Sequence, residues 1–408
     1  MKAGYVLLDG CADRPDARLN YTTPLDAAYT PNLDRISARA SLGRVITVRR
    51  GIAPESDIAV FNMLGYSFPE GYPGRGVIEA IGSGLDIGKG DLALRANLAS
   101  ASGRRILDRR AGRNLTQAEA EALQDEINSI KLPGAQLEFR ATVSYRGVLV
   151  IKDRGPLSAS ISNTDPAYSK VGGFGAAKKV SPGESIARCI PENSSRQAAR
   201  AAELINEFTR RALEVLGASQ VNKGRVSEGK LPVNCVLLRD AGDHPPKVPS
   251  FQEKYGIRGT ALVEMPAEVG IAKVLGMKTV AIKDRKDMKE KATLFSKEMK
   301  EDTLVYVHIK GPDEFGHDGD AVGKKKNIEL IDADFLSKVS RSPLDAKLGV
   351  SCDHATPCSI MMHSSDPVPV LMTRAGKGDS MRFTERNAMK GSLGLLAGRD
   401  VLGRLLGR

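Results

Sequence analysis

Three of the five histidines in this 408-residue chain lie beside aspartates in one C-terminal region. Asp313 and His317 are four residues apart in KGPDEFGHDGD. Asp353 and His354 are adjacent in SCDHATPC, and His363 follows nine residues later. Carboxylate oxygens and neutral imidazoles, without thiolates, suit borderline divalent ions such as Mn²⁺, Zn²⁺ or Co²⁺. Two carboxylates and three imidazoles exceed the needs of one open catalytic ion and fit two ions that share a phosphoryl group.

Each motif alone has a more ordinary explanation. A D-x-x-x-H pair is more often a contact within a helix than a pair of ligands. The apolar runs before the motifs favour the metal interpretation: TLVYVHIK ends just before the Gly-Pro that precedes Asp313, and KLGVSC ends just before Asp353. Short β-branched runs of this kind predict buried parallel strands, and α/β proteins bind ligands beyond the carboxyl ends of such strands.

The N-terminal part of the chain has a similar arrangement. An apolar strand, Ala3 to Leu8, ends at Asp9, which makes this residue a third candidate carboxylate ligand. In APESDIAVFNMLGY, Ser56 falls at or near the start of a helix that ends at Gly65. A serine in this place is usually an N-cap. The unpaired N–H groups there also favour an anionic phosphate, and a metal ion can activate a serine hydroxyl as a nucleophile.

Strand-like and helical segments alternate along the chain. A capping box that begins at Thr116 opens a helix to about Ile130, and Ser194 or Ser195 opens a longer helix that ends before Gly217. The alternation predicts an α/β fold with a mainly parallel sheet and helices on both faces. The predicted strands are Tyr5–Leu8, Arg44–Val48, Gly147–Ile151, Asn234–Leu238, Lys278–Ile282, Leu304–Ile309, Leu348–Ser351 and Val368–Met372.

The candidate ligands lie on both sides of a long segment that contains none of them. We therefore predict a discontinuous metal-binding core domain, residues 1–85 and 240–408, and an inserted smaller α/β domain, residues 86–239, for the substrate. A chain of 408 residues is long enough for two or three domains.

Composition argues against several classes of protein. The formal net charge is +11, but the positive residues are scattered among acids and lack interleaved aromatics, so we expect no nucleic-acid partner. No stretch approaches the ~18 apolar residues of a spanning helix, so we expect no membrane partner. The five cysteines have irregular spacing and form no evident disulfide framework, which is typical of the reducing cytoplasm. A structural zinc at Cys352 and Cys358 is disfavoured, because no second pair lies nearby.

The motifs also resemble those of a known family. LDG…DRP, APESDIAVFNMLGY, KGPDEFGHDGD and DHATPCSIMMHSSDPVPVL are similar to the signature segments of archaeal-type cofactor-independent phosphoglycerate mutase, in the alkaline-phosphatase superfamily. The resemblance implies an alkaline-phosphatase-like core and an isomerase of glycolysis that interconverts 3-phosphoglycerate and 2-phosphoglycerate through a phosphoserine. It implies two divalent ions, with Mn²⁺ expected before Zn²⁺, Co²⁺ or Mg²⁺, and no 2,3-bisphosphoglycerate.

The resemblance also assigns residues. It implies that Ser56 is the phosphorylated nucleophile and that Cys11 and Glu55, where the match departs from the family, replace no ligand. One ion site falls on Asp9, Ser56, Asp353 and His354, and the other falls on Asp313, His317 and His363. The best matches to substrate-binding residues are Arg109, Arg113, Asp165, Arg239 and Lys254. Arginine is favoured where a carboxylate or phosphate must be held bidentately.

Two other functions stay open. A metal-dependent phosphatase or phosphonatase of the same superfamily uses the same ions and serine but transfers the phosphoryl group to water. A basic binding protein uses the acid and histidine clusters only to hold structural metal. The large inserted segment favours a mutase, because it is suited to closing over the substrate and excluding water. The sequence leaves the oligomeric state open.

Overall fold

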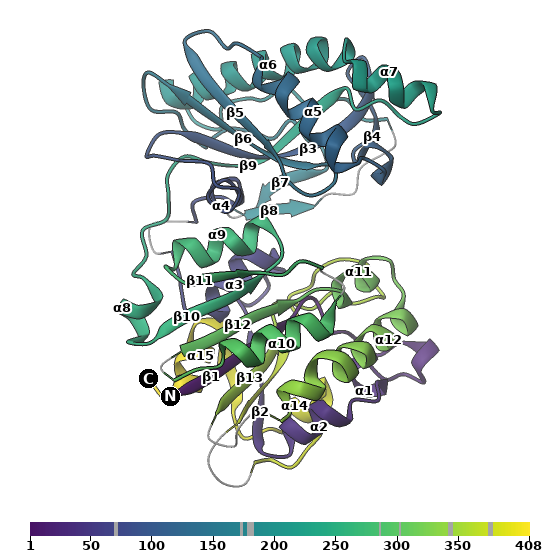
Figure 1. Ribbon diagram of the computed structural model, residues 1–408, viewed down its shortest axis with the longest axis vertical. Coiled ribbons are helices and arrows are strands. Elements are labelled where there is room, and N and C mark those ends of the chain that lie inside the picture. The colour runs from purple at the N-terminus through teal and green to yellow at the C-terminus, as the bar shows by residue number, and fades with distance from the viewer. Residues whose placement is uncertain are drawn as a thin grey trace. The chain divides into compact units, whose positions relative to one another are not determined.

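The computed structural model describes residues 1–68, 72–171, 174–177, 183–284, 287–301, 303–341, 346–373 and 378–408. They form two compact units, and Figure 1 labels most of their elements. The first unit comprises Met1–Ser67, Val248–Glu264 and Leu275–Arg408, and the second comprises Phe68–Lys247 and Met265–Val274. Neither unit is therefore continuous in the sequence.

An eight-stranded sheet forms the centre of the first unit. Among the described strands, β14 alone runs antiparallel to its neighbours in this sheet, and the other adjacent pairs are parallel. The predicted mainly parallel sheet is therefore confirmed. In spatial order the strands are β11 (Lys278–Ala281), β10 (Arg258–Val263), β12 (Thr303–Ile309), β1 (Lys2–Leu8), β13 (Lys347–Cys352), β14 (Val368–Thr373), β2 (Ala40–Ile46) and β15 (Gly394–Ala397).

Helices cover both faces of this sheet. The helices of this unit are α1 (Pro24–Ala27), α2 (Pro31–Ser37), α3 (Ser56–Met63), α8 (Phe251–Tyr255), α10 (Met288–Glu298), α11 (Pro312–His317), α12 (Ala321–Ile331), α13 (Ser337–Val339), α14 (Glu385–Ala388) and α15 (Gly398–Leu406). A Cβ on Gly4 of β1 would lie 2.5 Å from Phe295 of α10. Gly349 of β13 pairs with Tyr5, and a Cβ there would lie 2.8 Å from Leu405 of α15. Because consecutive strand residues point to opposite faces, α10 and α15 lie on opposite sides of the sheet.

The second unit contains an antiparallel sheet with β3 at its centre. Its strands are β3 (Leu92–Ser102), β4 (Arg105–Asp108), β5 (Ala135–Ala141), β6 (Arg146–Asp153) and β9 (Cys235–Gly242). Leu92 and Leu94 of β3 join one apolar cluster with helices α5 (Gln117–Asn128) and α6 (Arg196–Gly217). Ala93, between them, joins a separate cluster with α4 (Arg75–Gly82). The unit also contains α7 (Gln220–Ser227), α9 (Pro266–Val274) and the hairpin of β7 (Tyr168–Val171) and β8 (Phe174–Ala177).

The second unit extends beyond the predicted insert of residues 86–239. It also includes residues 68–85, 240–247 and 265–274, because α4 packs against both β3 and α9. The backbones of α4 and α9 approach closely where both helices have glycine: a Cβ on Gly82 would lie 1.8 Å from Pro266 O, and a Cβ on Gly270 would lie 1.9 Å from Ile78 O. No side chain fits between them, so these glycines allow the contact.

Local capping signals are present at the two helices where the sequence predicted them. Thr116 caps α5 in a capping box with Glu119, and the Ser195 hydroxyl caps α6 by accepting from Ala198 N. Both predicted caps are confirmed, but α6 includes Gly217 instead of ending before it. Among the described helices, none has the length and apolarity that crossing a membrane requires.

Glu385, the first residue of α14, ties this helix to the N-terminal part of the chain. Its carboxylate accepts hydrogen bonds from Thr23 Oγ1 at 2.7 Å and from Asp13 N at 3.1 Å. Burial nevertheless raises the pKa of Glu385 from 4.5 to about 7. The protonated side chain thus adds stability that is complete below pH 4.5 and is lost as the pH rises through 7.

We therefore expect the stability of the wild type, relative to a Glu385→Gln variant, to fall by up to about 3 kcal/mol between pH 5 and pH 8. Glutamine keeps the neutral shape but has no proton to lose. Urea unfolding of both proteins in the presence of chelator measures this difference without a contribution from bound ions. An equal dependence on pH in the two proteins would contradict the burial argument.

Candidate metal centre

The carboxyl ends of three adjacent parallel strands bring the candidate ligands together. Leu8 of β1 pairs with both Ile309 of β12 and Cys352 of β13, so the three strands end at the same level. Asp9 and Asp353 are the next residues after β1 and β13. The short helix α11, just after β12, carries Asp313 and His317, and His363 lies in the loop between β13 and β14. Parallel strands thus position residues that are hundreds of positions apart.

The two carboxylates at the strand ends each direct one oxygen to a common place. Asp353 Oδ1 accepts hydrogen bonds from Gly10 N at 3.1 Å and from His354 N at 3.0 Å, which leaves Oδ2 for another partner. Within the described part of the chain, neither Asp353 Oδ2 nor Asp9 Oδ1 accepts a hydrogen bond, although both atoms are buried. Burial raises the pKa of Asp9, but the charges of Lys310 and His308 outweigh it and hold that pKa well below its ordinary value. Two buried carboxylate oxygens of this kind fit a divalent cation.

His354 and Ser56 complete a group around these oxygens. His354 Nε2 lies 3.4 Å from Asp9 Oδ1, 3.2 Å from Asp353 Oδ2 and 3.0 Å from Ser56 Oγ. Ligand atoms that are each about 2.0–2.2 Å from one divalent ion lie roughly 3.0–3.5 Å from each other. The distances from His354 to the other three side chains therefore suit a shared ion.

A second group of possible ligands surrounds Asp313. Its two oxygens lie 3.5 Å from His317 Nε2 and 3.5 Å from His363 Nε2. Burial and the charge of Asp9 raise the pKa of Asp313. The combined effect of His363 and His354 is larger and holds that pKa below its ordinary value, so the carboxyl group is ionised. Burial lowers the pKa of His363, but its hydrogen bond to Asp313 raises that pKa to about 9. The imidazolium supplies the positive charge that this acidic group requires.

Backbone carbonyls orient the two imidazoles of this group. His363 Nδ1 lies 2.8 Å from Pro54 O, and His317 Nδ1 lies 3.1 Å from Met361 O. A carbonyl oxygen only accepts, so each Nδ1 carries a proton and each Nε2 is directed at Asp313. Such contacts on the far nitrogen are typical of histidines that bind metal.

The sequence missed His308 and Lys310 as residues of this site. His308 Nε2 lies 3.2 Å from Asp353 Oδ2 and 3.6 Å from Asp9 Oδ1. Lys310 Nζ lies 3.0 Å from Asp9 Oδ2 and 3.2 Å from His308 Nδ1. Burial and Lys310 lower the pKa of His308, but Asp353 and Asp9 raise it to about 10. A polar residue near the end of the apolar run TLVYVHIK was the available signal.

Ser56 lies at the start of α3, but it is not the N-cap. Glu55 occupies the N-cap position, and Ser56 is the first helical residue. The ordinary alternative, in which Ser56 is the N-cap of this helix, therefore does not apply. Its half-buried hydroxyl is directed at His354 instead of at the backbone of its own helix.

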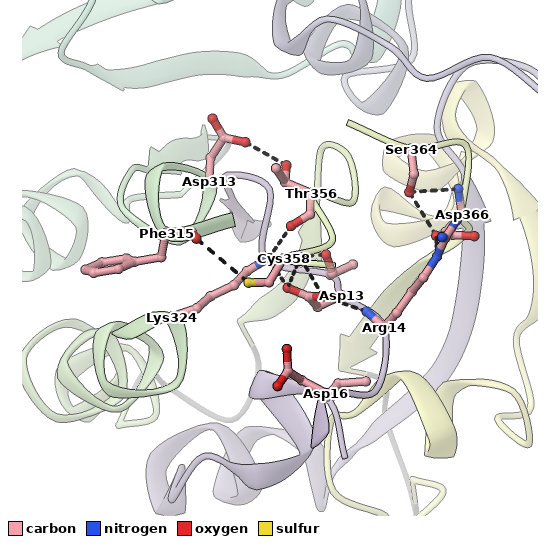
Figure 2. A network of polar contacts seen from close by, with 12 residues as sticks. Asp13, Arg14, Asp16, Asp313, Phe315, Lys324, Thr356, Cys358, Ser364 and Asp366 are labelled. Carbon is pink, nitrogen blue, oxygen red and sulfur yellow. Dashed lines mark hydrogen bonds and ion pairs between the residues drawn. The ribbon is translucent and has the colours of Figure 1, made fainter. Parts of the chain in front are cut away.

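A buried lysine fastens the loops that carry the ligands. Lys324 of α12 donates to Asp13 Oδ2 at 2.8 Å and to Thr356 O at 2.9 Å, as Figure 2 shows. Asp13 in turn accepts from Cys358 N at 3.1 Å. The loops after β1 and β13 are thus held to one helix. Cys358 Sγ lies 3.8 Å from Phe315 O, and all five cysteines are buried.

Three of the five predicted substrate-binding residues meet in the second unit. Asp165, fully buried, accepts from Arg109 Nε at 2.9 Å and lies 3.4 Å from Arg239 Nη1. Both guanidinium groups lie over the ring of Tyr168, at 5.1 and 4.0 Å. Further ion pairs extend this group to Asp240, Arg95, Glu79 and Arg75. The sequence had not identified these last four residues.

The other two predicted substrate-binding residues lie elsewhere. Arg113 is exposed on the 3₁₀ turn Ala111–Arg113 and is not part of the group around Asp165. Lys254 belongs to the first unit, where its ammonium group donates to Gly65 O at 2.5 Å and lies 4.7 Å from the ring of Tyr66. Gly65 follows the C-terminal end of α3, so this lysine is at the opposite end of the helix from Ser56.

The chain is similar in sequence to known proteins of one family. The sequence model of a family described as 2,3-bisphosphoglycerate-independent phosphoglycerate mutase matches residues 37–222. Proteins of that name from Aeropyrum pernix and Methanopyrus kandleri are 41% and 37% identical, over 98% and 97% of this chain and 97% and 93% of their own.

Two solved structures are similar over the whole chain. A protein from Pyrococcus horikoshii is 29% identical, with a TM-score of 0.78, over 100% of this chain and 97% of its own. The cofactor-independent phosphoglycerate mutase from Thermoplasma acidophilum is 30% identical, with a TM-score of 0.64, over 100% and 99%. The strand-end carboxylates and histidines thus occur in a chain that belongs to the 2,3-bisphosphoglycerate-independent phosphoglycerate mutase family.

Proposed function

We propose that this protein interconverts 3-phosphoglycerate and 2-phosphoglycerate through a phosphoserine at Ser56, without 2,3-bisphosphoglycerate. The observation that carries the proposal is the position of the Ser56 hydroxyl, 3.0 Å from His354 Nε2, which itself lies 3.4 Å from Asp9 Oδ1 and 3.2 Å from Asp353 Oδ2. The names of the relatives, which are isomerases, support the same reaction.

We propose that two divalent ions occupy the two groups of ligands. One is held by Asp9, Ser56, Asp353 and His354, and the other by Asp313, His317 and His363. We propose Mn²⁺, because mixed oxygen and imidazole ligands without thiolate suit it. Bound ions at these positions supply positive charge that favours the deprotonated serine and neutralises the phosphoryl oxygens.

In the proposed reaction, Ser56 Oγ attacks phosphorus in line. The new Oγ–P bond forms while the bond from phosphorus to the 3-oxygen of the substrate breaks. The serine loses its proton and the departing oxygen gains one, so the step is balanced. The glycerate then turns, and its 2-hydroxyl takes the phosphoryl group back and restores Ser56. Positioning and fixed charge account for most of the catalysis in such a transfer.

We propose that the cationic groups hold the carboxylate and phosphate of the substrate. Arg109 and Arg239 are the strongest candidates, because both are fixed by Asp165 and Tyr168. Fixed guanidinium groups lose less freedom when they bind a bidentate anion. Arg113 and Lys254 stay in the proposal as further contacts. We also propose the cytoplasm as the compartment, because free cysteines are typical of reducing conditions.

The first test is Ser56→Ala. We expect turnover to fall by at least about 10³-fold, because no other group takes over a lost nucleophile. The matched control is Ser219→Ala, which removes the hydroxyl that caps α7 and should retain activity. Coupled assay of 2-phosphoglycerate formation measures both variants. Residual activity of a tenth of wild type in Ser56→Ala would contradict the role of this serine.

The second test is removal of divalent metal. Dialysis against chelator should abolish activity, and Mn²⁺ should restore it without added 2,3-bisphosphoglycerate. Asp313→Asn and Asp353→Asn should each lower kcat by about 10²-fold or more, because ligands of one centre act together. Metal analysis after dialysis checks that the ions have left. Full activity of a protein shown to be metal-free would exclude the two-ion site.

The third test separates a mutase from a phosphatase. With ³²P-labelled 3-phosphoglycerate, label should appear in 2-phosphoglycerate with little inorganic phosphate, because a mutase protects its phosphoserine from water. Carbon-labelled free glycerate should not enter the product at early times. Stoichiometric release of labelled inorganic phosphate would favour the phosphatase.

A further inference from the structure

We propose that the hydroxyl of Thr356 is a positioning group shared by both ion sites, and that it couples the binding of the two ions. The inference rests on the proposed two-ion centre. It adds a residue to that centre and a dependence of one ion on the other.

The evidence is the position of one buried oxygen between two ligand groups. Thr356 is fully buried in the loop after β13, and its Oγ1 donates to Asp313 Oδ1 at 2.6 Å, as Figure 2 shows. The same Oγ1 lies 3.1 Å from His354 Nδ1. Asp313 belongs to the group with His317 and His363, whereas His354 belongs to the group with Asp9 and Asp353. One hydroxyl therefore contacts a ligand of each site.

The chemistry of the three groups fixes the direction of both hydrogen bonds. The Asp313 carboxylate only accepts, so the single proton of the hydroxyl is directed to it. The Thr356 oxygen must then accept from His354, which places the ring proton on Nδ1. The other ring nitrogen, Nε2, is directed at Asp9, Asp353 and Ser56, and its lone pair is available when it carries no proton. This is the tautomer that can bind an ion.

A hydroxyl at this position can both accept from His354 and donate to Asp313, whereas a carbonyl can only accept. His317 and His363 receive the same orientation from Met361 O and Pro54 O, which only accept. A carbonyl in place of Thr356 would orient His354 but would give Asp313 no donor. An ion on His354 Nε2 makes Nδ1–H a stronger donor, which polarises the hydroxyl and strengthens its bond to Asp313. Filling one site thus prepares the other.

The surroundings hold this hydroxyl in place. Thr356 N donates to Ala12 O at 3.1 Å, and Lys324 Nζ donates to Thr356 O at 2.9 Å. Gly10 lies beside the hydroxyl: a Cβ there would be 2.5 Å from Thr356 Oγ1. Gly316 lies beside the backbone and the methyl group, where a Cβ would be 2.4 Å from Thr356 O and 2.8 Å from Cγ2. The packing leaves the side chain little freedom to turn.

Two substitutions separate the hydroxyl from the methyl group. Thr356→Val keeps the shape and removes the hydroxyl, whereas Thr356→Ser keeps the hydroxyl and removes the methyl. Calorimetric titration of the metal-free proteins with Mn²⁺ should give affinities about 10–100-fold weaker at both sites in the valine variant. The serine variant should bind both ions within about threefold of wild type. Thr209→Val, which removes a buried hydroxyl bonded within α6, is the matched control and should bind as wild type.

Three results would overturn the inference. They are wild-type binding by Thr356→Val, loss of only one ion in that variant, and loss of ions in Thr356→Ser. If the valine variant fails to fold, the ¹⁵N signals of the His354 ring in metal-free wild type decide instead: Nδ1 must carry a proton, and an Nδ1 without a proton refutes the inference. If the wild-type protein binds no ions, the result would instead contradict the proposed function, which requires two ions.

Discussion

The concentration of negative charge at the carboxyl ends of β1, β12 and β13 is the constraint on which the first unit depends. Asp9 and Asp353 are buried and Asp313 is nearly so, and the charge of Asp9 opposes the ionisation of Asp313. Carboxylates placed together in this way are costly unless positive charge accompanies them. The sheet alone does not supply it, because parallel strands only fix where the acids lie. The surrounding loops must therefore supply positively charged groups or bind cations.

Cationic side chains lie in two places around these acids. Lys310, His308 and His363 place positive charge beside the acids, which keeps them ionised without bound metal. Farther out, the buried Lys324 pairs with Asp13 and holds the loops by their backbone oxygens. A lysine without an acidic partner in that position would be destabilising. The same side chains thus stabilise the fold and preserve oxygens that are available to a cation.

The sequence predicted those residues whose role follows from their place in a local pattern, and it missed those whose role depends on packing. Asp9 and Asp353 were found because each ends an apolar run, and parallel strands bring such ends together. The central strand β3 was missed, because its alanines and serines have little β-propensity although the strand is buried. His308 was hidden inside an apolar run. The direction of Thr356 Oγ1 depends on packing across Gly10 and Gly316, which no local pattern records.

The order of strands in the central sheet has a consequence for biosynthesis. β1 is made long before β12 and β13, yet it lies between these two strands, and Lys2 pairs with Thr303. At ~5–20 residues per second, a ribosome takes roughly 15–60 s to supply the first of these neighbours. During that time the apolar segment Ala3–Leu8 has neither of its partners, whereas most of the second unit, up to Lys247, is already complete. The nascent chain is therefore expected to gain its antiparallel sheet first, and to need protection of its N-terminal strand until the C-terminal third emerges.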